Sequence, residues 1–311
     1  MYRQFLEASS IHSKLHVFLK VTPLLGSSTL KRALVGVGTV EDIRKKFEEA
    51  TGTLFAVDAE GLLGEAAAPL RRLANINDAT LQDIAAARAA IREAREAIGG
   101  TEALCDLIAA RPISTDEKVI GFPFEDWERR KDDLETHGAV RAARRDLEGL
   151  QVLHFPIAFP EVFLRSRPGF DVILGNPPWQ EATIEEDAFW GRFRPGGLRR
   201  TTSQREQEAI IRQFREERPD LLALYKREAS EAQRIRQALT GGNYPGMGTG
   251  DPDFYKAFCW RFWHLTAAEG GRIGVVLPRS ALAAKGSTEF RLTMFDEAAS
   301  VNIAILLNNR K

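Results

Sequence analysis

The sequence predicts an α/β fold built around a parallel sheet, and three segments of its second half carry that prediction. A short apolar segment at residues 169–175, GFDVILG, ends in glycine. A second, GRIGVVLP at 271–278, stops at proline, and a third, VNIAILLNN, covers 301–309. Helical sequence separates them, and strands that alternate with helices pair in parallel. We therefore expect a sheet with buried strands.

The segment that precedes the second strand, DFYKAFCWRFWHLTAAE, predicts an amphipathic helix. Asp251 is suited to the N-cap position and Pro252 to the first turn, and Gly270-Gly271 ends the helical pattern. The apolar stripe of this helix comprises Phe254, Phe258, Phe262 and Leu265.

Residues 33–58 predict a strand, a glycine turn, a helix and a second strand that ends at Asp58. The turn holds Gly36 and Gly38, and a GxG turn with an acid about 20 residues later is a partial form of the dinucleotide-binding pattern. Thr39 stands where the full pattern would continue. The pattern makes these residues candidates for a cofactor loop, and a structural turn is the preferred interpretation.

Long charged helical segments interrupt the apolar ones. Residues 79–98 predict a helix that Gly99-Gly100 ends, residues 124–149 predict another, and a third helical region breaks near Pro219. A solvated helical insertion is the preferred interpretation of the first two. The expected organisation is a partial core segment at 1–60, a helical insertion at 61–150, and a catalytic core at 151–311 with a helical insertion at 181–240.

Composition restricts the function classes. The chain has 311 residues, with 43 Lys+Arg and 43 Asp+Glu, so it lacks the basic excess of a protein that coats nucleic acid. A local basic groove stays compatible with these numbers. The two cysteines, Cys105 and Cys259, form no metal-binding pattern, and we expect neither zinc nor a disulfide. We find no apolar signal core and no membrane-length apolar run, and expect a cytoplasmic protein without membrane contact.

The first apolar segment leads directly into Gly175-Asn176-Pro177-Pro178-Trp179. In open α/β sheets, ligands bind beyond the carboxyl ends of the strands. Proline fixes φ and restricts the residue before it, so this turn is rigid and leaves carbonyl groups without a local N–H partner. The asparagine side chain adds another acceptor, and the tryptophan offers a face on which a planar base can stack.

This set of groups suits the activation of an amine. The nitrogen of an aromatic amine is a poor nucleophile because its lone pair is delocalised into the ring. Two acceptors on its hydrogens localise that pair, and the nitrogen can then attack an electrophilic methyl group. A Pro-rich structural turn is the alternative interpretation of the same residues.

The segment GFDVILGNPPW resembles motif IV, (N/D/S)PP(Y/F/W), of the S-adenosylmethionine-dependent amino-methyltransferases. With FPEVF before it, it resembles the large type IIG adenine-specific DNA methyltransferases of restriction–modification and phage-defence systems. The stretches DPDFYKAFCWRFWHLTAAEGGRIGVVLPRSAL and ALVGVGTVEDI are similar to other segments of that family. The resemblance implies a partial Rossmann-like, doubly wound methyltransferase sheet with long helical insertions.

The resemblance also implies S-adenosylmethionine as cofactor and double-stranded DNA with a flipped adenine as substrate, because a stacked base cannot be reached. Asn176 and the Pro177 carbonyl would bind the adenine N6, and Pro178 would hold the turn. Trp179 would stack on the base. Further residues that it implies are Gly175 and Pro278 beside the substrate, and Asp171 with Asn176 beside the cofactor.

The family's upstream cofactor loop and its downstream target-recognition domain are not identifiable here. We therefore expect a piece of a longer or split enzyme that binds S-adenosylmethionine poorly alone, that depends on a separate polypeptide, and that leaves the edge of the strand at 169–175 bare. Two functional alternatives stay open. One is a protein glutamine N5-methyltransferase, which faces the same amine chemistry, and the other is a non-catalytic remnant or subunit.

Overall fold

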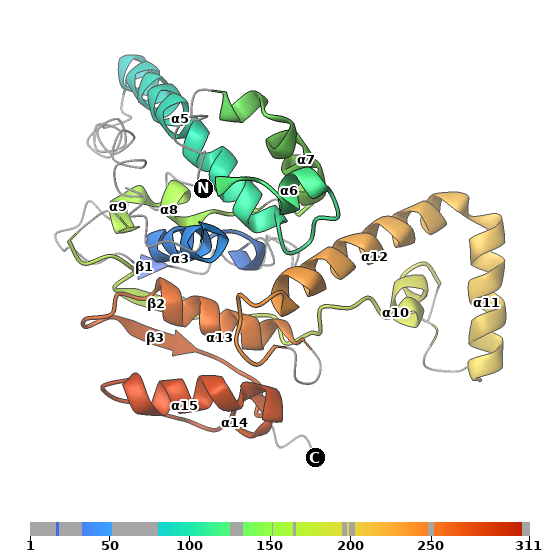
Figure 1. The fold of residues 1–311 in the computed structure, drawn as a ribbon. Helices are drawn as coiled ribbons and strands as arrows, with labels where there is room; N and C mark the ends of the chain where they lie inside the picture. Colours follow the sequence, from blue (N-terminus) through green and yellow to red (C-terminus); the bar gives the residue numbers. More distant parts are fainter. Residues whose placement is uncertain are drawn as a thin grey trace.

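The structure, a computed structural model, describes residues 17–18, 33–51, 80–124, 133–150, 152–163, 166–194, 198, 203–247 and 252–306. Helices predominate, and the strands form one small parallel sheet (Figure 1). The elements follow in the order β1 (Val17–Phe18), α3 (Val40–Thr51), α5 (Leu81–Ala110), α6 (Glu117–Ile120), η3 (Leu134–Thr136), α7 (Gly138–Leu147), α8 (Phe155–Ala158), α9 (Pro160–Phe163), β2 (Val172–Gly175), α10 (Glu186–Gly191), α11 (Gln204–Glu217), α12 (Pro219–Thr240), α13 (Phe254–Leu265), β3 (Arg272–Val275), α14 (Ser280–Ala283), η4 (Lys285–Ser287) and α15 (Thr288–Glu297).

The sheet has three strands in the order β1-β2-β3, and both pairings are parallel, which confirms the expected parallel arrangement. In the register, Ile173 lies beside Ile273 and Gly175 lies beside Val275. The expectation of a bare edge along 169–175 is wrong, because β2 is the central strand. Within the described residues, β1 and β3 are the two edge strands.

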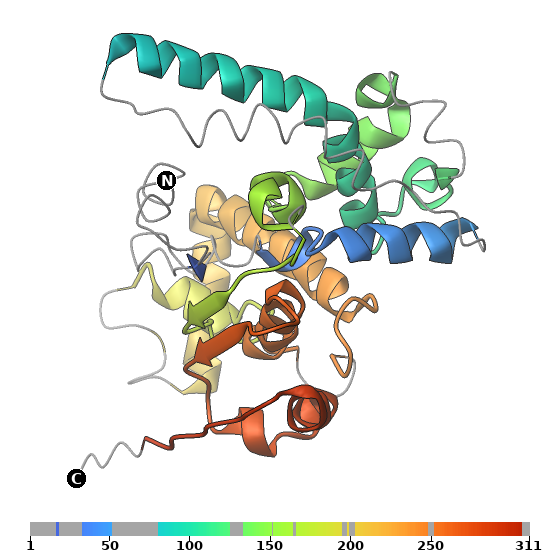
Figure 2. The same ribbon diagram turned by 90° about the vertical axis from the view of Figure 1, so that its left-hand side faces the viewer.

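One face of the sheet is covered and the other is exposed. Ile173 is fully buried, and the α13 side chain Phe262 lies against Gly175 on the covered side. Leu174, the next residue along β2, is 46% exposed. The expectation that 271–278 forms a buried strand is therefore only half right: β3 forms, but its first three residues are exposed. The helix α13 covers one side only, and the described residues place no second layer opposite (Figure 2).

The expected strand at 301–309 is wrong over its described part. Residues 301–306 have no strand pairing and their side chains are largely exposed. A strand is stable only when its backbone groups find partners in a neighbouring strand, and apolar side chains alone do not supply them. Residues 307–309 lie outside the described residues.

The helix α13 confirms the predicted apolar stripe, since Phe254, Phe258, Phe262 and Leu265 are all buried. Its start differs from the expectation, because Pro252 precedes the helix, and Asp251 lies outside the described residues. The helix is buried on nearly every side and occupies the centre of the molecule (Figures 1 and 2).

The helix α5 begins as predicted, with a capping box between Thr80 and Asp83, but it continues through Gly99-Gly100 to Ala110. Each glycine costs about 1 kcal/mol in a helix interior. The second half of α5 offsets that cost because its side chains, Leu104 among them, are buried in the main core. The solvated-insertion interpretation therefore fails for residues 101–110. Of the expected helix at 124–149, the structure shows η3 and α7, and residues 125–132 lie outside the described residues. The solvated-insertion interpretation fails for α7 as well, because Val140 and Leu147 are buried in the main core.

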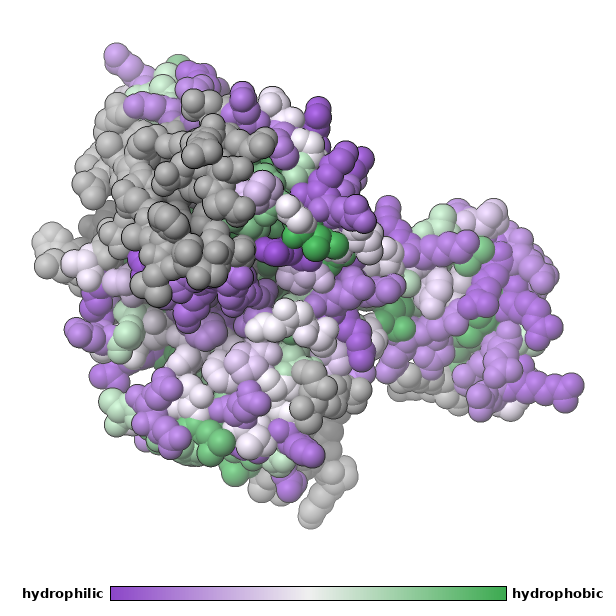
Figure 3. Space-filling model, viewed as in Figure 1, coloured by the Kyte–Doolittle hydropathy of each residue, from purple (hydrophilic) through white to green (hydrophobic). Residues whose placement is uncertain are grey.

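The helices α10, α11 and α12 extend from the body as an arm (Figure 1). The predicted break is confirmed, since α11 ends at Glu217 and α12 starts at Pro219. The tip of the arm has its own small core, and its surface is mainly hydrophilic (Figure 3). The buried residues of that core are Phe189, Trp190, Leu198 and Leu221.

The first described segment corrects another expectation. Residues 33–35 are helical rather than a strand, and α3 confirms the predicted helix after the glycine turn. The expected strand at 53–58, with Asp58, lies outside the described residues.

Candidate functional site at the carboxyl edge of the sheet

The residues that follow β2 and β3 lie at one edge of the sheet, because parallel strands end on the same side. The Val276 N–H donates a hydrogen bond to the Gly175 carbonyl over 3.0 Å, so the pairing continues to the last residue of β2. Pro278 follows two residues later and its carbonyl accepts from Ala281 at the start of α14. Gly175 and Pro278, both predicted from sequence, are therefore brought to the same edge.

Gly175 has a packing reason to be glycine. A Cβ atom at this position would lie 3.2 Å from Cζ of Phe262, closer than most real contacts of this kind. The strand can therefore approach the ring of Phe262 closely only without a side chain. Glycine at position 175 therefore allows the end of β2 to pack closely on α13.

The far end of the proline turn is also fixed. The Phe254 N–H donates to the Gln180 carbonyl over 2.9 Å, and Glu181 forms an antiparallel bridge with Asp253. The four residues Asn176 to Trp179 therefore span between two anchors, the end of β2 and the start of α13. Two prolines within so short a span leave the backbone few alternative conformations.

The four side chains of this span differ in exposure. Pro177 is buried and Pro178 half-buried, so the prolines form the inner part of the turn. Asn176 is exposed, and Trp179 is 49% exposed. Within the described part of the chain, no aromatic ring pairs with Trp179. The turn therefore presents an amide and an indole face at the edge of the sheet.

The structure separates Asp171 from these residues. Asp171 precedes β2 and so lies at the amino end of the strand, about 16 Å of extended chain from Asn176. Its carboxylate is buried and forms an ion pair with Arg167. The physical reason is the rise of about 3.3 Å per residue in a strand, which places residues five apart at opposite edges of so short a sheet.

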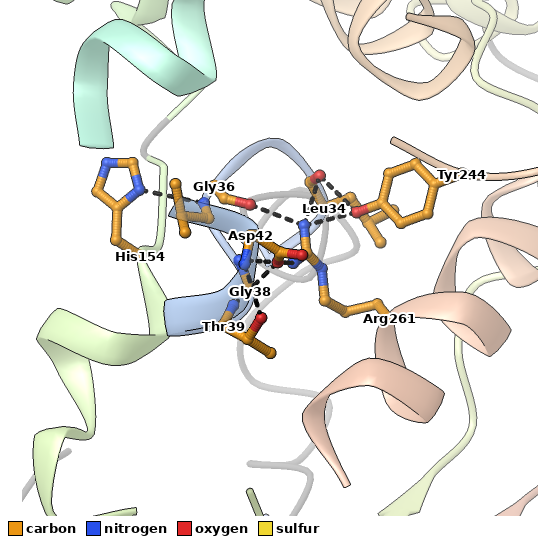
Figure 4. A network of polar contacts seen from close by, with 9 residues as sticks. Leu34, Gly36, Gly38, Thr39, Asp42, His154, Tyr244 and Arg261 are labelled. Atoms are coloured by element: carbon orange, nitrogen blue, oxygen red, sulfur yellow. Dashed lines mark hydrogen bonds and ion pairs between the residues drawn. The ribbon is translucent and has the colours of Figure 1, made fainter. Parts of the chain in front are cut away.

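Other parts of the chain occupy the space beside Gly36 and Gly38 in the candidate cofactor turn (Figure 4). A Cβ at Gly36 would lie 2.0 Å from the Leu153 carbonyl oxygen, and one at Gly38 would lie 2.0 Å from Nη1 of Arg261. Both glycines are therefore explained by close approach of other parts of the chain. Asp58, the third member of the weak pattern, lies outside the described residues.

The backbone N–H groups of this turn already have acceptors. Gly38 and Thr39 both donate to the Asp42 carboxylate, over 3.1 and 2.9 Å, and Val37 donates to Nδ1 of His154 over 3.2 Å. These are the groups that would hold an anionic ligand in a cofactor loop. Residues 36–39 therefore do not fit the binding of S-adenosylmethionine, and the turn is an N-terminal cap for α3.

Arg261 connects that cap to α13, and no local pattern in the sequence marks it. Its Nη2 donates to the carbonyls of Leu34 and Gly36 and to the Tyr244 hydroxyl, over 3.1, 2.7 and 2.7 Å. Burial raises the pKa of Tyr244, although the nearby Arg261 opposes this, so the hydroxyl stays protonated and donates to the Leu34 carbonyl over 2.6 Å.

The two cysteines, which could otherwise act as nucleophiles, are both buried. Burial raises the pKa of Cys259 to about 12 and that of Cys105 well above its usual value, so neither is a thiolate near neutral pH. Among the described residues, no cluster of His, Cys, Asp or Glu has the composition of a metal site.

The comparisons with known proteins add no assignment. No family model, no curated protein and no solved structure matches this chain. Fold and site together define an α/β protein, mostly helical, with a small parallel sheet and a rigid proline turn at its carboxyl edge. Over the described range, no helix combines the length and the apolarity that crossing a bilayer requires.

Proposed function

We propose that this chain carries the amine-binding site of an S-adenosylmethionine-dependent methyltransferase that modifies adenine N6 in double-stranded DNA, as part of a restriction–modification or phage-defence system. The observation that carries the proposal is the turn from Asn176 to Trp179, anchored at both ends, with the amide and the indole exposed. A rigid turn holds its acceptors in place before the substrate arrives, and such preorganisation is the main source of electrostatic stabilisation in enzymes.

In this proposal the side-chain oxygen of Asn176 and the Pro177 carbonyl accept the two hydrogens of the adenine amine. Trp179 stacks on the base after it has been flipped from the duplex. Pro178 fixes the turn, and Gly175 and Pro278 border the base. S-adenosylmethionine supplies the electrophilic methyl group. Since residues 36–39 do not fit it, we assign its binding to other residues or to a separate polypeptide, and we give Asp171 no part in it.

The test is adenine methylation in cells that co-express the chain with the reading frames beside its gene. Sequencing that detects N6-methyladenine should find it at one recurrent DNA sequence. Asn176→Ala should abolish that signal, since losing one positioned polar partner costs about 10²–10³ in rate. The melting temperature of the variant is measured alongside, so that loss of the methylation signal is separated from loss of the fold.

Two outcomes would overturn the proposal. Full methylation by the Asn176→Ala variant would show that Asn176 takes no part in catalysis. Absence of N6-methyladenine in cells with the wild-type chain would exclude methylation of DNA and favour the alternative of a non-catalytic remnant or subunit. The glutamine N5-methyltransferase alternative predicts a methylated glutamine in a cellular protein instead, which mass spectrometry of the same cells detects.

A further inference from the structure

A buried hydroxyl beside the carboxyl edge of the sheet has no role in the proposed reaction. Tyr255, in the first turn of α13, is only 2% exposed. Its hydroxyl oxygen is shielded from solvent and makes no hydrogen bond with any residue that the structure describes. A buried hydroxyl without a partner is unfavourable, because it has given up its hydrogen bonds to water. Phenylalanine would fill the same space without that cost.

The position of Tyr255 connects it to both loops of the candidate site. Its ring belongs to a small apolar cluster with Cys259 and Ala281, against which Leu277 packs. Leu277 directly precedes Pro278 in the loop that follows β3, and Ala281 lies in α14, where its N–H donates to the Pro278 carbonyl. The residue before Tyr255, Phe254, donates to the Gln180 carbonyl and so holds the end of the proline turn. This first turn of α13 therefore touches the loops after β2 and after β3.

The shielding of the hydroxyl restricts what it can do. A group with no solvent exposure does not touch a ligand at the edge of the sheet directly. It can act on the segment that packs against its ring, residues 276–281, which comprises the loop after β3 and the start of α14, has backbone carbonyl groups and carries Pro278. A hydrogen bond formed only when this loop closes would favour the closed, substrate-bound state over the free state.

We propose that Tyr255 is a positioning residue of this site. Its hydroxyl donates to a backbone carbonyl of segment 276–281 when the amine substrate binds, and this hydrogen bond holds Pro278 against the substrate ring. The inference rests on the proposed function, because it takes the adenine of DNA as the substrate that closes the loop.

The expected signature of Tyr255→Phe separates this role from a purely structural one. The free variant should unfold at the wild-type temperature or above, because the hydroxyl has no partner to lose in the free state. Its KM for unmethylated DNA should rise about three- to tenfold, the range for one neutral hydrogen bond, while kcat changes less. A structural tyrosine would show the reverse: a lower melting temperature and an unchanged KM.

The matched control is Ser287→Ala. Ser287 also carries a buried hydroxyl, at 4% exposure, with no hydrogen-bond partner among the described residues, but it lies in η4 beyond α14. Removing this hydroxyl should leave the KM for DNA unchanged.

The experiment compares wild type, Tyr255→Phe and Ser287→Ala, purified with the co-expressed partners, by melting temperature and by steady-state methylation of unmethylated DNA. A wild-type KM in Tyr255→Phe would overturn the inference alone. So would equal KM changes in both variants, or a lower melting temperature of the free Tyr255→Phe variant. Lack of any methyl transfer by the wild type would overturn the proposed function, and the inference with it.

Discussion

The Arg261 guanidinium donates a hydrogen bond to the Gly36 carbonyl over 2.7 Å, although 225 residues separate the two in sequence. Arg261 is buried, and its other hydrogen bonds go to Leu34 and Tyr244. Residues 36–39 have a local sequence that resembles a cofactor loop, but with this hydrogen bond they form a structural cap of α3. Both residues 33–39 and the candidate site are therefore held by α13.

Isothermal titration with S-adenosylmethionine should detect no micromolar binding to the isolated 311-residue chain. The N–H groups of Gly38 and Thr39 already donate to Asp42, so a ligand would have to displace that carboxylate. Micromolar binding by the isolated chain would contradict this expectation and would make residues 36–39 the first candidate for the cofactor site.

Replacing Arg261 by methionine should lower the free energy of unfolding by about 3 kcal/mol, because buried carbonyl groups would lose a charged hydrogen-bond donor. Urea unfolding followed by circular dichroism measures this value. Arg261→Lys is the matched control, since lysine keeps the charge but not the planar set of donors, and it should recover only part of the loss. A change below about 0.5 kcal/mol, the level of an ordinary surface substitution, would show that the network does not hold the segment.

Trp179→Ala should weaken capture of the flipped base by about 1–3 kcal/mol, whereas Trp179→Phe should retain much of the binding. The fluorescence of 2-aminopurine, placed at the target adenine that methylation mapping identifies, reports the flipped state. Equal fluorescence with alanine and tryptophan would exclude stacking at this position. Since Trp179 is half-exposed, neither variant should unfold at a noticeably lower temperature.

Asp106 should make the protein acid-sensitive. Burial raises the pKa of Asp106, but hydrogen bonds and charge interactions with His154 and Arg144 outweigh it, so the pKa lies below its usual value. The His154 and Arg144 nitrogens lie 3.1 and 2.9 Å from its carboxylate oxygens. A carboxyl with a lowered folded pKa stabilises the fold above its unfolded pKa of about 3.9, and this contribution is lost as the pH falls through the folded pKa.

Asp106→Asn should therefore lower the free energy of unfolding at pH 7 by about 1.5–3 kcal/mol, the range for hydrogen bonds to a charged group. The difference from wild type should shrink below about pH 4, where the wild-type carboxyl also takes up its proton. Urea unfolding at several pH values measures both quantities. A difference that stays constant down to pH 3 would assign the effect to packing rather than to charge.

Local sequence predicted the features that local chemistry determines. The strand before Gly175, the proline turn, the apolar stripe of α13 and the break at Pro219 all follow from residues close together in the chain. The features that failed depend on distant partners. Residues 33–35 are held by Arg261 and Tyr244 rather than by a neighbouring strand, and α5 crosses Gly99-Gly100 because its second half is buried.

The same limit applies to the candidate site. The pattern from Asn176 to Trp179 is continuous in sequence, so its residues could be singled out without a structure. The anchoring of Gln180 by Phe254 and the position of Tyr255 between two loops are tertiary relationships. The expected strand at 301–309 failed over its described part for the related reason that an apolar segment does not show whether a partner strand is available.

The long sequence separation within the Arg261 network also bears on synthesis of the protein. Leu34 leaves the ribosome 227 residues before Arg261 does. At about 5–20 residues per second, roughly 10–45 s pass before Arg261 can donate to the carbonyls of Leu34 and Gly36. During that interval residues 33–37, which are buried in the finished protein, have none of their final contacts with this helix, so the nascent chain presents an apolar stretch to chaperones until residue 261 has been translated.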